Sequence, residues 1–258
     1  MLNVIADRLN SARETATPIS QISSEIKVFS RAEAYTIQEL QFAIRKSQGE
    51  VQIGWKMGLT SEAKRKQMNL DSPLYGFLTD RMQIQNGKNF NLTGSIHPKI
   101  EPEVAFLISK DLSGSPSREQ VLESCSAVCA ALEILDSRYQ QFKYFSMEDV
   151  ISDNSSSSHF VLGAWNKNFQ NLDLKNLKME MLADGKAIET GNSRDISGDP
   201  VVSVIQLCEL LNERKQILKA GSIVLAGAAT PAMSLVDGQS IELKIQGLEN
   251  CQLHITKN

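Results

Sequence analysis

The chain has 258 residues, of which 41% are hydrophobic and 22% charged, and its formal net charge is -3 at pH 7. This is the composition of an ordinary soluble globular protein, folded as one large domain or as a core with a smaller lobe. The acidic balance argues against a nucleic-acid partner, and no run reaches the roughly 18 consecutive apolar residues that a membrane span needs.

The N-terminal sequence indicates a protein of the cytoplasm, and the cysteine spacing gives no sign of a zinc site. The opening MLNVIADRLNSARE lacks the basic start and long apolar stretch of a signal peptide, and Asp7 falls within it. The 4 cysteines include no Cys-x-x-Cys pair of the kind that binds zinc. We therefore expect reduced thiols in the protein core.

Helices are predicted first along the chain. Apolar residues recur at helical spacing in two stripes, Leu2, Ile5, Leu9 and then Ile37, Leu40, Ile44. Ser30 with Glu33 forms a capping-box pattern, and Gly49 is a typical helix stop. A further short helix is expected over residues 61–68. We expect residues 1–80 to form a helix-rich N-terminal lobe.

From about Arg81 onward the pattern favours strands, at MQIQ, KIEPEVAFLI, IVLAGA, SIELKI and CQLHIT. A helix is expected from Ser117 to Cys129, leading into a strand over AALEILD, and another starts at Asp199-Pro200. Residues 81–258 are therefore expected to form a β-rich catalytic core, and the fold class is α+β.

The strand IEPEVAFLI carries two carboxylates, Glu101 and Glu103, on the same face. Burying two like charges is costly without a positive partner, and a divalent cation would supply one. Glu133, isolated among apolar residues of ALEILD, fits a third ligand from an adjacent strand. Three hard oxygen ligands favour Mg²⁺ or Mn²⁺ over zinc and leave positions open for substrate. The alternative is that these are edge-strand glutamates that face solvent.

Three long segments carry a family resemblance. Residues 54–82, 97–107 and 132–163 closely resemble the 4-oxalocrotonate decarboxylase and 2-keto-4-pentenoate hydratase family, which belongs to the fumarylacetoacetate hydrolase superfamily. The resemblance extends from about residue 30 to the end. It implies that the helix-rich lobe sits on a mixed β core like the C-terminal domain of fumarylacetoacetate hydrolase.

The resemblance also implies roles for individual residues. It makes Glu101, Glu103 and Glu133 the magnesium ligands and makes Lys56 and Asp80 a catalytic polar pair. Without the resemblance, Lys56 between Trp55 and Met57 would be taken for a surface lysine whose stem covers apolar neighbours. Residues expected to contact the substrate are Ser156 and Asn154 near its keto-acid end and Thr230 on the distal wall.

The reaction implied is decarboxylation of 2-oxohex-3-enedioate to 2-hydroxypenta-2,4-dienoate in the meta-cleavage of aromatic compounds, which makes the chain a lyase. Segments 56–61, 73–78 and 136–144 look like the decarboxylase branch, whereas 226–231 departs from it. One alternative is the hydratase that acts on 2-hydroxypenta-2,4-dienoate. Another is a weakly catalytic, metal-stabilised subunit that binds the partner enzyme.

In the expected mechanism, the metal binds the 1-carboxylate and 2-oxo oxygen of the substrate and stabilises the charge left by loss of carbon dioxide. Lys56 steers the substrate or a proton, and Asp80 anchors Lys56 or manages a proton. Arg138 is expected to bind a carboxylate or to form an internal salt bridge, and His97 and His159 to be structural. A homo-oligomer and a complex with the cognate hydratase or decarboxylase are expected partners.

Overall fold

The computed structural model describes residues 1–26, 29–61, 65, 72–141 and 146–257. The expected helix over residues 61–68 therefore lies outside the described residues, apart from Ser61 and Arg65. The described α-helices are α1 (Leu2–Thr15), α2 (Ile22–Glu25), α3 (Arg31–Ser47), α5 (Arg118–Glu123), α6 (Met147–Ser152) and α7 (Pro200–Glu213). Among these, no helix combines the length and the apolar character that crossing a membrane requires.

Strands form two sheets. The 8-stranded sheet has the order β2-β1-β10-β5-β6-β7-β3, with β11 paired to β5. Its strands are β1 (Gln52–Gly58), β2 (Leu74–Thr79), β3 (Gln83–Ile84), β5 (Lys99–Ile108), β6 (Cys125–Leu135), β7 (Ser157–Leu162), β10 (Ile223–Ala228) and β11 (Met233–Ser234). The 5-stranded sheet has the order β4-β13-β12-β8-β9. Its strands are β4 (Asn89–Asn91), β8 (Lys178–Ala183), β9 (Lys186–Asn192), β12 (Ser240–Ile245) and β13 (Cys251–Thr256).

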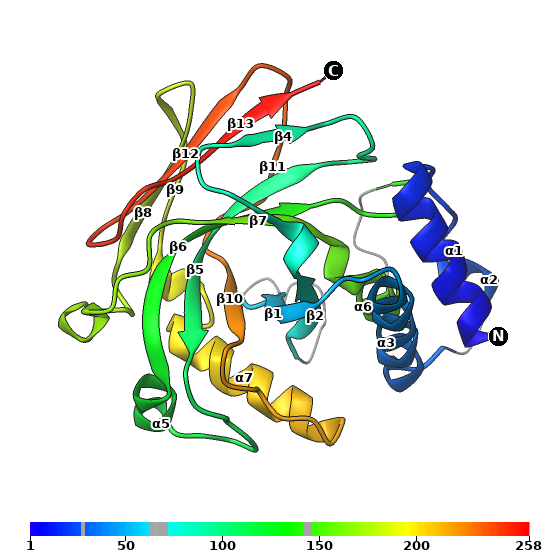
Figure 1. The fold of residues 1–258 in the computed structure, drawn as a ribbon, viewed down its shortest axis with the longest axis horizontal. Coiled ribbons are helices and arrows are strands. Elements are labelled where there is room, and N and C mark those ends of the chain that lie inside the picture. Colours follow the sequence, from blue (N-terminus) through cyan, green and yellow to red (C-terminus); the bar gives the residue numbers. More distant parts are fainter. Residues whose placement is uncertain (27–28, 62–64, 66–71, 142–145, 258) are drawn as a thin grey trace.

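Both sheets are mixed, because β1 pairs with β10, β3 with β7 and β13 with β4 in parallel, whereas most other neighbours are antiparallel. Figure 1 shows α1, α2 and α3 grouped at one side of the molecule and α7 running below β10. This arrangement confirms the α+β class and the strand-rich mixed core.

The N-terminal helices form by the local signals read from the sequence. The Ser30 hydroxyl accepts a hydrogen bond from the Glu33 amide, and the Glu33 carboxylate accepts one from the Ser30 amide, so the capping box is present. The helix α3 ends at Ser47, and Gly49 follows with φ 88°. An apolar cluster that includes Leu9 and Ile37 joins α1 to α3.

Alternation along β5 separates two apolar environments. Val104 and Phe106 belong to a large cluster that includes residues of the 5-stranded sheet and of α7. Ala105, on the opposite face, packs in a smaller cluster with Leu225 and Phe160 from β10 and β7. Successive residues of a strand point to opposite faces, so the expected carboxylates lie on the same face as this smaller cluster.

The helix expected from Ser117 to Cys129 is wrong in its second half. Its capping box forms, but α5 ends at Glu123 and β6 begins at Cys125. Every residue of β6 except Ser126 is buried. A strand buried on both faces is continuously apolar, so residues four apart also fit a helical stripe and the two patterns cannot be separated.

Strands also begin earlier than expected, since β1 and β2 precede Arg81 and belong to the larger sheet. Both are short, and β2 is buried along its whole length, so it shows no alternation of polar and apolar residues. The larger sheet therefore draws strands from both sides of residue 80. The division into residues 1–80 and 81–258 stays a prediction.

The remaining elements agree with the sequence. Strands β5, β10, β12 and β13 have the expected bounds, and α7 begins at Pro200 with the Asp199 carboxylate accepting from the Val201 amide. All 4 cysteines are buried and free. The serine run is packed, because Ser155, Ser156 and Ser157 are buried.

Gly54 marks a close approach between β1 and β10, and substitution by alanine should be costly. A Cβ there would lie 2.1 Å from the Ile223 carbonyl oxygen. We expect Gly54→Ala to lower the free energy of unfolding by about 3 kcal/mol through overpacking, as measured by urea denaturation. Gly185→Ala is the control, because a Cβ there meets nothing within 4 Å and only its φ of 76° opposes the change. Equal losses in the two variants would contradict the packing argument.

Candidate functional site

Three glutamates meet on one face of the larger sheet. In the register of β5 and β6, Glu101 lies directly opposite Glu133, and Glu103 is two residues further along β5. One carboxylate oxygen from each of the three lies within 4.8 Å of the others. Glu103 and Glu133 are fully buried, so the reading of solvent-facing edge glutamates does not hold for them. Two rigid strands thus present three oxygen ligands to one point.

Lys56 reaches this cluster from β1. Its side chain is buried, and Nζ lies 3.0 Å from Glu133 Oε2 and donates a hydrogen bond to the Ser155 carbonyl oxygen at 3.3 Å. Burial alone would lower the pKa of Lys56, but the carboxylates of Glu133, Glu101 and Glu103 outweigh it and raise the pKa. Lys56 is therefore an ammonium ion, which donates hydrogen bonds and is a poor amine nucleophile.

Glu103 has one carboxylate oxygen that accepts no hydrogen bond from the described residues. The Gly227 amide donates to its Oε2 at 2.6 Å, while Oε1 is buried and has no hydrogen-bond partner among the described residues. Burial raises the pKa of Glu103 well above its usual range, and Glu133 and Glu101 raise it further. A buried, unpartnered oxygen in a cluster of three acids and one lysine fits a site that takes up a cation.

Glu133 is held on both of its oxygens. Ser157 Oγ donates to Oε1 at 2.8 Å, while Oε2 faces Lys56. The sequence analysis selected Ser156, but the serine whose hydroxyl reaches Glu133 is Ser157. Ser156 Oγ lies 3.4 Å from Asp153 Oδ2. Ser157 was missed, because simple alternation from Phe160, which pairs with Glu133, would select Ser158, and only the register shift between Ile134 and Leu135 brings Ser157 to the same face.

The loop before β7 has an unusual backbone. Asn154, Ser155 and Ser156 have φ of 48°, 53° and 57°, in the left-handed region that costs non-glycine residues free energy. The surrounding structure fixes this conformation. Arg138 forms a buried salt bridge with Asp153 and donates to the Ser157 carbonyl oxygen at 3.1 Å. The result directs the Ser155 carbonyl oxygen at Lys56.

Asn154 binds the strand β2 on both ends of its amide. The Phe77 amide donates to Asn154 Oδ1 at 2.8 Å, and Asn154 Nδ2 donates to the Phe77 carbonyl oxygen at 3.1 Å. The side chain thus replaces a neighbouring strand at the edge of the sheet. Its expected role in substrate binding stays a prediction.

Asp80 does not meet Lys56, and the expected contact between them is wrong. In the antiparallel register Lys56 lies opposite Gly76, and Asp80 lies four residues further along, roughly 13 Å at the usual rise of a strand. Asp80 is exposed, and its Oδ1 accepts a hydrogen bond from the Val51 amide at 2.9 Å. The carboxylate that pairs with Lys56 is Glu133.

The remaining candidates have structural contacts. Arg138 forms the internal salt bridge with Asp153. His97 Nε2 lies 3.0 Å from the Tyr139 carbonyl oxygen, and His159 Nδ1 lies 2.8 Å from Ser158 Oγ. These contacts agree with the structural roles expected for both histidines.

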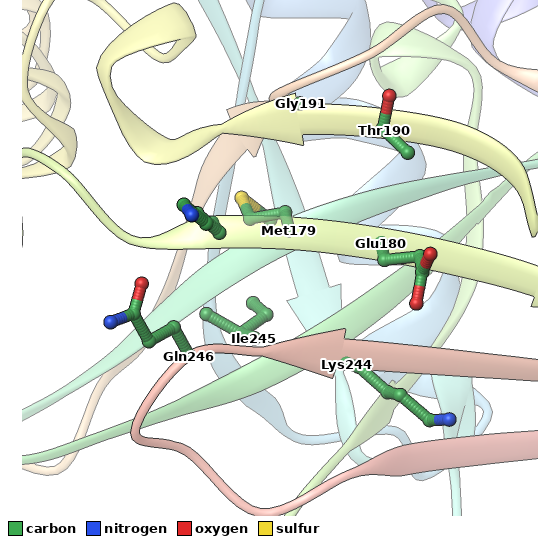
Figure 2. A pocket seen from close by; sticks show the side chains of 8 residues that line it. Met179, Glu180, Thr190, Gly191, Lys244, Ile245 and Gln246 are labelled. Carbon is green, nitrogen blue, oxygen red and sulfur yellow. The ribbon is translucent and has the colours of Figure 1, made fainter.

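Thr230 lies near a groove of about 530 Å³ over β8, β9 and β12. Its methyl group faces Gly191, where a Cβ would lie 2.9 Å away, and its Oγ1 donates to the Pro231 carbonyl oxygen at 3.3 Å. Figure 2 shows Gly191 among the residues that line the groove, with Glu180 and Lys244 on neighbouring strands. Glu180 is the one carboxylate among the lining residues, so the groove does not repeat the three-glutamate arrangement.

The mixed sheet and the three-glutamate cluster are the features to compare with known protein families. The chain belongs to the fumarylacetoacetate hydrolase family, since residues 40–256 match the family described as fumarylacetoacetate (FAA) hydrolase C-terminal. The match includes all three glutamates and Lys56. It confirms the family resemblance and the fold expected from the sequence.

Individual members of related enzyme groups are similar to this chain over nearly its whole length. A 4-oxalocrotonate decarboxylase from a Pseudomonas species is 40% identical over 252 residues, which cover 98% of this chain and 97% of the relative. A 2-hydroxyhexa-2,4-dienoate hydratase from Comamonas testosteroni is 32% identical, with coverage of 97% and 94%. The solved structure of 4-oxalocrotonate decarboxylase from Pseudomonas putida G7, complexed with magnesium and adipate, has a TM-score of 0.94, 31% identity and coverage of 98% and 97%.

The ion pair between Lys56 and Glu133 should contribute measurably to the free energy of unfolding. Removing one partner of a buried pair leaves an uncompensated charge, so Lys56→Met should lower the free energy of unfolding by about 3 kcal/mol or more. Adding Glu133→Gln should restore part of this loss, which a double-mutant cycle in urea measures. The exposed strand residue Lys178 provides the control, and Lys178→Met should change stability little. Additive effects of the two site substitutions would show that the pair is not coupled.

Asn154→Ala tests whether Asn154 supports the strand. Both backbone groups of Phe77 would lose their partner, so we expect a loss of roughly 2 kcal/mol in the free energy of unfolding. Ser156→Ala, in the same loop, should cost much less because its hydroxyl makes one long contact. A variant of wild-type stability that fails to bind substrate would instead assign Asn154 to the substrate.

Proposed function

We propose that the chain is a metal-dependent 4-oxalocrotonate decarboxylase, a carboxy-lyase that converts 2-oxohex-3-enedioate to 2-hydroxypenta-2,4-dienoate in the meta-cleavage degradation of aromatic compounds. The observation that carries the proposal is the convergence of Glu101, Glu103 and Glu133 around one buried lysine. The greater identity to decarboxylases than to hydratases supports the choice of reaction.

The three glutamates would hold Mg²⁺ or Mn²⁺. All of the ligand atoms are hard carboxylate oxygens, and the buried Glu103 Oε1 has no hydrogen-bond partner within the described part of the chain. When bound, the cation supplies positive charge that polarises substrate oxygens and stabilises negative charge on them. The magnesium in the related decarboxylase structure supports this assignment.

Lys56 supplies the second positive charge of the site. In the reaction the bond to the far carboxylate breaks, carbon dioxide leaves, and the electron pair moves along the conjugated chain to the 2-oxo oxygen. That oxygen must gain a proton to give the 2-hydroxy product. Lys56 keeps its proton beside the glutamates and is the cation placed to stabilise the developing charge and to donate this proton.

Neighbouring groups keep the carboxylates in place. Ser157 holds Glu133 and the Gly227 amide holds Glu103, so neither carboxylate has to reorganise as the substrate binds. Ser156, Asn154 and Thr230 remain proposed substrate contacts. Asp80, which lies away from Lys56, is proposed as a catalytic residue on the family resemblance alone.

We also propose the cellular location and the partners expected from the sequence. The chain would act in the cytoplasm on a small 2-keto acid, as a homo-oligomer and in a complex with the cognate hydratase. The instability of the dienol product supports such a complex, since direct transfer would limit its loss to solvent.

The deciding experiment supplies purified protein and Mg²⁺ with 2-oxohex-3-enedioate, following carbon dioxide release, and separately with 2-hydroxypenta-2,4-dienoate, following its absorbance. We expect carbon dioxide from the first. Glu101→Gln and Glu133→Gln should each lower this turnover by at least about 100-fold, because each removes a ligand charge. Glu180→Gln, a strand glutamate in the other sheet, should leave it unchanged.

The other outcomes are distinct. Turnover of the dienoate alone would assign the chain to the hydratases and make the departure at residues 226–231 the better guide to its substrate. Metal binding without turnover of either compound would favour a partner subunit. Full activity in Glu133→Gln would remove the glutamate cluster from the mechanism.

A further inference from the structure

A second polar cavity lies apart from the glutamate cluster. It has a volume of about 600 Å³ and lies between the helices α1 and α3 and the start of β7. Its lining includes four arginines, which are Arg13, Arg45, Arg81 and Arg138. None of the three clustered glutamates and no part of Lys56 lines it. The residues that form it come from six separate segments of the chain.

Two of the arginines are fixed in position. Arg45 is buried, pairs with Glu50 at 2.8 Å and donates to Thr79 Oγ1 at 3.2 Å. Arg138 is also buried and is held by Asp153, as described above. These two guanidinium groups form a preorganised positive wall whose own hydrogen bonds are largely satisfied.

The other two arginines have unused donors. Arg13 donates to Asn10 Oδ1 at 3.1 Å and lies 3.4 Å from Glu14, but its Nε is buried without a partner among the described residues. Arg81 donates to the Gln48 carbonyl oxygen at 2.9 Å and forms no salt bridge within the described part of the chain. A buried, unpaired guanidinium donor is unfavourable unless a ligand satisfies it.

The acids that line the cavity are already engaged. Asp136 accepts hydrogen bonds from the Ile96 and His97 amides. Glu50 accepts from Arg45 and Thr79, and Glu14 from the side chains of Gln48 and Asn10. These contacts occupy carboxylate oxygens of all three acids, although the Glu14 side chain is 43% exposed, and the four arginines outnumber the three acids in the lining.

His159 adds no positive charge to the site at neutral pH. Burial lowers the pKa of His159 to about 4, and the nearby Arg45 and Arg13 contribute to the same direction. Burial likewise lowers the pKa of Arg13, with Arg45 lowering it further. The cavity is therefore a region in which cations repel one another and an anion is favoured.

We propose that this arginine-lined cavity binds a small organic anion that carries carboxylate groups, at a site separate from the glutamate cluster. Guanidinium groups bind carboxylates through paired, charge-assisted hydrogen bonds. The volume lies in the range of about 300 to 1,000 Å³ typical of small-molecule sites, which favours an organic acid over a single inorganic ion. The proposal does not depend on the reaction assigned above.

The test is calorimetric titration of succinate into the metal-free protein, after the chelator has been removed by dialysis and at constant ionic strength. We expect saturable binding of one succinate per chain. Arg13→Gln should weaken the Kd by about tenfold or more, equivalent to about 1.4 kcal/mol. Arg81→Gln, at a more exposed position, should act in the same direction and serves if Arg13→Gln does not fold.

Arg8→Gln is the matched control, because Arg8 lies on the same helix α1 but pairs with Glu25 outside the cavity. It removes the same charge and should leave the Kd unchanged. The proposal is overturned by a lack of saturation, by equal weakening in Arg8→Gln, or by binding that occurs only after Mg²⁺ is added. Tighter binding of inorganic phosphate than of succinate would overturn the choice of a carboxylate ligand.

Discussion

The organisation of the site depends on one buried ion pair, that of Lys56 with Glu133. The two residues come from strands that are not neighbours in the larger sheet, since β10 and β5 lie between β1 and β6. Three carboxylates within 4.8 Å would repel one another strongly in a buried setting, and the ammonium group reduces that repulsion. The cluster still carries an excess of negative charge, and this excess is what suits it to a divalent cation.

The loop before β7 gives this ion pair its geometry. Three successive left-handed residues are strained, so they persist because neighbouring contacts fix them. Asp153 is bound by Arg138 just before the run, and Ser157 is bound to Glu133 just after it. The same segment therefore serves both the fold and the site. Its backbone accepts hydrogen bonds from Arg138 and also points the Ser155 carbonyl oxygen at Lys56.

The sequence predicted those features that have a local period. Glu101 and Glu103 stood out because strand alternation places residues two apart on one face, and Glu133 because it lay alone in an apolar strand. Asp80 was misplaced because nothing local shows which residue of β2 lies opposite Lys56, and a shift of a few residues in register moves a side chain by a strand's length. The left-handed run and the role of Ser157 depend on long-range contacts, for which single-sequence patterns carry no signal.

The edge of the larger sheet has a further consequence. β2 is the terminal strand, so its outer backbone groups would be open to pairing. Gln38 donates to the Tyr75 carbonyl oxygen at 2.9 Å, and Asn154 occupies both backbone groups of Phe77. Side chains from a helix and a loop thus occupy these outer backbone groups and leave fewer of them open to pairing with a strand of another molecule.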